Sequence, residues 1–152
     1  MGFMMPGRFA VPQHILIGFF ATFLVTLAQS MTMFYFIGTG KYVKDLVSKE
    51  LAGNPSASNE FIRRTKVFKA RVFPPALWAM LFTMATMIVG GGVHTRMIPA
   101  WVHLGLAIVS LYYNGMAFWT DAKFMIEQNL LMQEIERMIP AESGDEPRTQ
   151  KA

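Results

Sequence analysis

Apolar residues fill three long stretches of the chain, and the interior of each stretch carries no charged residue. The stretches cover residues 9–40, 74–93 and 97–120. Crossing about 30 Å of hydrocarbon at about 1.5 Å per residue takes roughly 20 residues of helix. None of the stretches alternates as barrel strands do, and lipid admits only helices or closed barrels. The pattern predicts three transmembrane helices, with spans at about 11–37, 75–93 and 99–120.

Helical spacing continues beyond these spans. Residues 40–73 predict a helical hairpin broken at Gly53-Asn54-Pro55, with Ser56 or Ser58 as the cap of its second helix. Residues 121–139 predict a further helix, which Pro140 ends. We expect Pro74-Pro75 to kink or restart the second long helix, because the pair removes two backbone donors.

The predicted fold class follows from these elements. It is an all-α membrane protein with three long antiparallel transmembrane helices, at about 11–51, 58–93 and 99–139, and cytoplasmic helical extensions. Residues 1–139 form a single three-helix membrane domain, with a cytoplasmic helical hairpin at 40–73 and a cytoplasmic helix at 121–139. Residues 140–152 are polar and are expected to form a disordered tail.

Composition strengthens the membrane assignment and removes several kinds of chemistry. Charged residues make up 16% of the chain, against about 25% in ordinary soluble domains. The absence of cysteine excludes disulfides, thiolate metal sites, covalently attached haem and thiol catalysis. The first apolar stretch continues to Ile37, which is longer than the core of a signal peptide, so we expect it to be retained.

Basic residues are concentrated between the first two spans, and this distribution predicts the orientation. The segment before the first span and the turn between the second and third spans hold one basic residue each, Arg8 and Arg96. The loop between the first two spans holds eight: Lys41, Lys44, Lys49, Arg63, Arg64, Lys66, Lys69 and Arg71. Short loops rich in Lys and Arg stay in the cytoplasm. The N-terminus is expected outside and the C-terminus inside, with a bacterial inner membrane as the expected location. The formal charge of +4 favours anionic lipid rather than nucleic acid.

Small and polar residues recur along one side of each predicted helix, as expected for contacts between membrane helices. We expect these positions to face the bundle: residues 14, 18, 21, 25, 28 and 32; residues 76, 79, 83, 86 and 90; and residues 100, 103, 107, 110, 114, 117, 121, 124, 128, 131, 135 and 138. Gln29, Ser110 and Asn114 are expected to serve intramembrane packing. Gln29 and Asn114 are placed at comparable depth on helices of opposite direction, where a hydrogen bond between them would fix the register. Asp121 is assigned to the inner boundary, as a snorkelling or capping residue.

Three histidines and one arginine are the candidate binding residues. His14, His94 and His103 all fall near the predicted outer surface, and Arg96 lies in the turn between His94 and His103. Two imidazoles on facing helices could ligate a b-type haem, with Arg96 at a propionate. Three imidazoles could instead bind copper or zinc, and a histidine pair could relay protons or contact a quinone. The alternative is that these histidines contact only water, headgroups and neighbouring carbonyls.

Two functions are consistent with these features. The first is a structural or accessory subunit of a larger membrane complex, with the lipid bilayer and other protein subunits as partners. The alternative is a haem- or metal-binding anchor for electron transport that uses the outer histidines. An independent enzyme is not expected, because no nucleophile–base pair and no metal–base arrangement is evident in the sequence.

Overall fold

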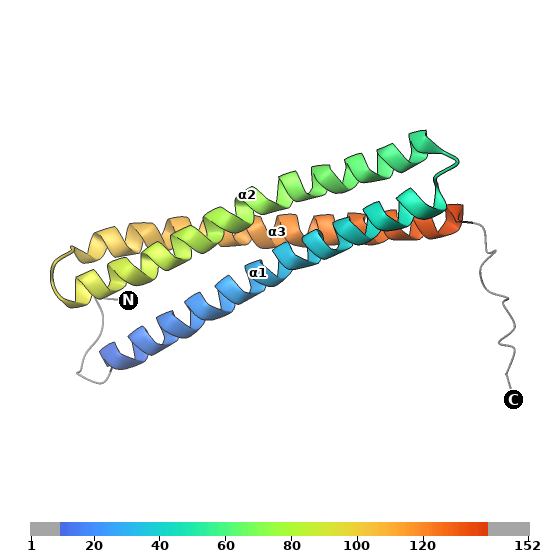
Figure 1. Cartoon of the computed structure of the whole chain (residues 1–152). Coiled ribbons are helices and arrows are strands. Elements are labelled where there is room, and N and C mark those ends of the chain that lie inside the picture. The colour runs from blue at the N-terminus through green and yellow to red at the C-terminus, as the bar shows by residue number, and fades with distance from the viewer. Residues whose placement is uncertain (1–9, 140–152) are drawn as a thin grey trace, which may run out of the picture.

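The computed structural model describes residues 10–139 as three long helices (Figure 1). These are α1 (Ala10–Glu50), α2 (Pro55–His94) and α3 (Ala100–Met138), each about 60 Å long at about 1.5 Å per residue. α2 runs antiparallel to both neighbours, so α1 and α3 point in the same direction. The described residues contain no strand, which confirms the all-α fold class. The predicted tail at 140–152 lies outside the described residues.

Two of the helices, α1 and α2, contain stretches that are long and apolar enough to cross a membrane. The apolar stretch of α3 is interrupted by polar side chains, namely His103, Ser110, Tyr112, Tyr113 and Asn114. The third span at 99–120 and the placement of the helix ends in the cytoplasm remain predictions.

The start and the middle of α2 differ from expectation. The helix begins at Pro55, and Asn54 caps it by accepting a hydrogen bond from the backbone N–H of Ala57 at 3.2 Å. Neither Ser56 nor Ser58 is the cap. α2 also continues through Pro74-Pro75 without a restart. The carbonyls that lose their donors there belong to residues 70 and 71, which are both exposed and so accessible to other partners.

The hydrophobic core is concentrated at the end of the bundle that holds the turn at residues 51–54, here called the α1–α2 end. Its buried members come from all three helices: Phe36, Val43, Val47, Leu51, Phe61, Phe68, Val72, Leu131 and Ile135. One helical face of α2, formed by residues 61, 65, 68 and 72, is buried throughout. Met138 is the exception on α3, since it is exposed.

The opposite end, which holds the turn at residues 95–99, is packed differently and is called the α2–α3 end. α2 and α3 stay together along this half, with Ala76, Ala79, Ser110, Asn114 and Ala117 buried between the helices. α1 leans away from them toward its N-terminus (Figure 1) and packs mainly on α2. Its expected bundle positions Ala21 and Ala28 are exposed, whereas Gln29 is fully buried. The predicted face of α1 was therefore wrong by about one residue.

Candidate functional site

Two of the three histidines meet near the α2–α3 end. The rings of His14 on α1 and His103 on α3 lie edge to face, with centroids 6.3 Å apart and an interplanar angle of 89°. A Cβ on Gly90 of α2 would lie 3.0 Å from Cε1 of His103, so this imidazole packs directly on the α2 backbone. Nδ1 of His103 is buried and has no hydrogen-bond partner among the described residues.

His94 and Arg96 do not join this pair. His94 is the last residue of α2 and is exposed, and Arg96 is exposed in the following turn. Within residues 10–139, no group of three or more His, Asp or Glu side chains is close enough to hold a metal ion. The structure therefore brings the exposed His14 together with the half-buried His103, and His94 and Arg96 take no part in this contact.

The turn that carries Arg96 explains the run of glycines before it. The N–H groups of Arg96 and Met97 donate to the carbonyls of Val93 and Gly92 at 3.0 and 2.9 Å, which is a Schellman motif. Arg96 occupies the left-handed position of this motif, with φ 62°, where glycine is usual. Gly92 lies against the side chain of Ile98, and Gly90 lies against His103. Gly91, between them, has nothing near its Cβ position.

A hydroxyl and amide cluster joins α2 to α3 in the same half of the bundle. Asn114 Nδ2 donates to Thr83 Oγ1 and to the Ser110 carbonyl, both at 2.8 Å. The hydroxyls of Thr83 and Ser110 are 3.1 Å apart. Ser110 and Asn114 therefore contact α2.

Gln29 has a different neighbour from the one expected. Because α1 and α3 run in the same direction, Gln29 does not lie opposite Asn114 but beside the carboxyl group of Asp121. Asp121 is only 4% exposed, so its assignment as a snorkelling or capping residue was wrong. Gln128, one heptad further along α3, is fully buried as well. The sequence does contain a signal for this arrangement, because Asn114, Asp121 and Gln128 recur every seven residues.

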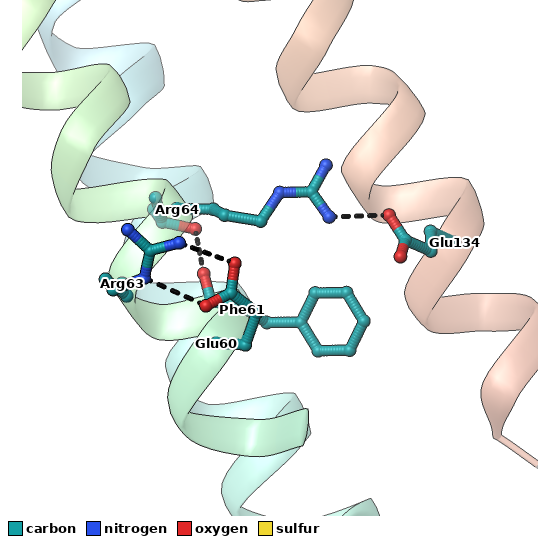
Figure 2. Close-up of polar contacts among 6 residues, drawn as sticks. Glu60, Phe61, Arg63, Arg64 and Glu134 are labelled. Atoms are coloured by element: carbon teal, nitrogen blue, oxygen red, sulfur yellow. Dashed lines mark hydrogen bonds and ion pairs between the residues drawn. The ribbon is translucent and has the colours of Figure 1, made fainter. Parts of the chain in front are cut away.

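Charged contacts at the α1–α2 end lie on the surface of the bundle (Figure 2). Arg64 on α2 reaches α3, where its Nη1 donates to Glu134 Oε2 at 2.7 Å. One residue earlier, Arg63 holds both carboxylate oxygens of Glu60 at 2.8 Å, and this hydrogen bonding lowers the pKa of Glu60. Such exposed pairs are worth little individually, but the Arg64 pair spans two helices and helps to set their register.

Comparison with protein-family models, with curated proteins and with solved structures finds no match to this chain.

Proposed function

We propose that the protein is a structural or accessory subunit of a larger membrane complex, in which a hydrophobic helix of another subunit packs on α3. The observation that carries this proposal is a continuous apolar face on α3, called the outward stripe. Its residues follow helical spacing and are each between 57% and 78% exposed: Trp101, Ile108, Tyr112, Trp119, Ile126 and Leu130.

The length of the outward stripe argues for a protein partner. From Trp101 to Leu130 the stripe extends about 44 Å along the helix axis, compared with about 30 Å of hydrocarbon. Trp101 suits a membrane interface, but Ile126 and Leu130 have no polar atom and follow the charged Lys123. Lipid tails that cover one end of the stripe leave the other end uncovered, whereas a partner helix covers both.

Two glycines on the same side of α3 suit such a helix. Gly105 and Gly115 have no atom of this chain within 4 Å of their Cβ positions. Small residues let helix backbones approach closely within a membrane. The concentration of basic residues toward the α1–α2 end supports an orientation with that end in the cytoplasm, and a bacterial inner membrane suits this arrangement.

Site-specific photo-cross-linking in native membranes tests the proposal. A photoreactive amino acid replaces Ile126, and a matched control replaces Ile88, which is 75% exposed on α2. We expect position 126 to give one discrete adduct, which mass spectrometry identifies as a different membrane protein, and position 88 to give none. An adduct with a second copy of this chain, or with lipid alone at both positions, would contradict the accessory role.

A second candidate function, a haem- or metal-binding anchor, is favoured by the contact between His14 and His103. The two imidazoles come from different helices at one level of the bundle, as the two axial ligands of a b-type haem do. Iron, copper and zinc analysis of the purified protein tests this candidate. Iron at about one atom per chain that is lost in both His14→Ala and His103→Ala would establish it, and a metal-free protein would refute it.

A further inference from the structure

Asp121 is a buried carboxyl group without a countercharge. Neither of its oxygens has a hydrogen bond that meets standard geometry among residues 10–139, and its polar neighbour is the Gln29 amide. Gln29 and Gln128 are fully buried, and their side-chain nitrogens and oxygens are also without partners in that part of the chain. Buried polar side chains in this state favour ordered water as an additional partner, and the carboxyl group can also bind a proton.

No charged group within residues 10–139 forms an ion pair with Asp121, and the half-buried Lys69 of α2 lies with its ammonium group against Gly40 of α1. α1 contains no charged residue between position 10 and Lys41. Phe68 and Thr83 of α2 both contact α3. The buried α2 residues between them are Val72, Ala76 and Ala79, which have no titratable side chain. The neighbouring charges are exposed: Arg71 on α2, and Lys123, which lies 4.0 Å from Glu127 on α3.

These surroundings make the two protonation states of Asp121 comparable in cost. Burial without a countercharge disfavours the ionised form. Gln29, however, can serve either form, because its NH₂ group donates to a carboxylate and its oxygen accepts from a protonated carboxyl. A leucine at position 29, which is similar in size to glutamine, would not form a hydrogen bond with either protonation state of Asp121.

Access to Asp121 differs between the two ends of the bundle. Toward the α1–α2 end, Gln128 is followed by the apolar core around Leu131 and Ile135. Toward the α2–α3 end, the fully buried Ala76, Ala79 and Ala117 lie between Asp121 and Asn114, and beyond these small residues polar side chains continue on the facing sides of α2 and α3. These side chains are Asn114, Ser110, Thr83, Thr86 and His103, and the amide oxygen of Asn114 and Nδ1 of His103 are buried without partners in the described chain.

We propose that Asp121 is a reversible proton-binding site inside the bundle, and that protons reach it from the α2–α3 end along the polar side chains between His103 and Asn114. Asn114 and Asp121 are about 10 Å apart along the axis of α3, so the proton does not pass directly from one side chain to the other. Water between these groups carries the proton. Gln29 acts as a positioning residue for the carboxyl group. The pair of histidines marks the entrance to this route. The site does not depend on whether a partner covers the outward stripe.

Infrared difference spectroscopy of the full chain in lipid nanodiscs tests the proton site. Between about pH 5.5 and pH 9, where exposed carboxyl groups of ordinary pKa are already largely ionised, we expect one carboxylic C=O band that appears and disappears reversibly. Asp121→Asn removes this band, whereas Glu136→Gln, at an exposed position, leaves it unchanged. A band that survives Asp121→Asn, or one that is constant across the pH range, would overturn the proposal.

Hydrogen–deuterium exchange of the same band tests the route. Asn114→Leu should slow exchange at Asp121 by about tenfold or more, whereas Gln128→Leu should leave the rate within about twofold, since a tenfold change corresponds to one modest added barrier. Circular dichroism confirms that each variant retains its helical content. Equal exchange rates in the two variants, or slower exchange in Gln128→Leu, would refute entry from the α2–α3 end.

Discussion

Leu130 and Leu131 are adjacent leucines on α3 whose surroundings are opposite, and truncating each to alanine tests the rotation of the helix. Leu131 is fully buried in the core at the α1–α2 end, whereas Leu130 is 57% exposed on the outward stripe. Removing three buried carbons costs about 2.4 kcal/mol at about 0.8 kcal/mol per carbon, and the cavity raises the loss to about 3–4 kcal/mol. At Leu130 less than half of the side chain is covered, so the loss is about 1 kcal/mol or less.

Denaturant unfolding of the two variants in detergent, followed by circular dichroism, gives the comparison. We expect Leu131→Ala to lower the free energy of unfolding by about 2–3 kcal/mol more than Leu130→Ala does. Because the substitution is the same and the positions are adjacent, differences in helix propensity cancel. Equal losses, or a larger loss for Leu130→Ala, would mean that α3 does not present this face to the core.

Three further predictions concern the α2–α3 end and the orientation. Gly90→Ala should lower the thermal midpoint of unfolding because its Cβ meets an imidazole of α3, whereas Gly91→Ala should be neutral or stabilising by up to about 1 kcal/mol; the reverse order would contradict the packing. Asn114→Ala should cost about 0.6–2 kcal/mol by breaking its hydrogen bond to α2, measured by unfolding in detergent, and an unchanged stability would remove that bond's role. Arg96→Cys should react with an impermeant thiol reagent in intact cells and Arg63→Cys only after permeabilisation; the opposite pattern would invert the proposed topology.

The all-helical architecture of three long helices and the bundle-facing side of α3 could be predicted from the sequence. The expected positions on α3 include the residues buried in the structure: Ser110, Asn114, Ala117, Asp121, Gln128, Leu131 and Ile135. This was possible because polar residues interrupt an apolar helix at heptad intervals, and membrane helices direct such residues toward one another.

The bundle-facing side of α1 was harder to predict, and the reason is physical. Its first part is apolar around the whole circumference, so hydrophobicity defines no phase, and the small residues Ala21 and Ala28 are exposed. Gln29 was expected to lie opposite Asn114, whereas its neighbour on α3 is Asp121. The offset between α1 and α3 depends on how α2 is placed between them, and no local pattern carries that information.

The histidines of the candidate site also could be predicted only in part from the sequence. The sequence marks His14, His94 and His103 as residues at one end of the helices, but only the tertiary structure pairs two of them and leaves His94 exposed. Asp121 was expected on the bundle-facing side of the third helix, but it was also assigned to the membrane boundary as a snorkelling or capping residue. Its burial results from three helices that converge at that level.

The sequence by itself therefore determined the three helices and, apart from the start of α2, their approximate ends, because apolar length, proline, glycine and charge act within a few residues of chain. The tertiary structure alone decided which side chains meet: Gln29 with Asp121, Asn114 with Thr83, and His14 with His103. These pairings depend on helix rotation and axial offset. Both are set by the summed packing of side chains from all three helices, to which each residue contributes only a small part.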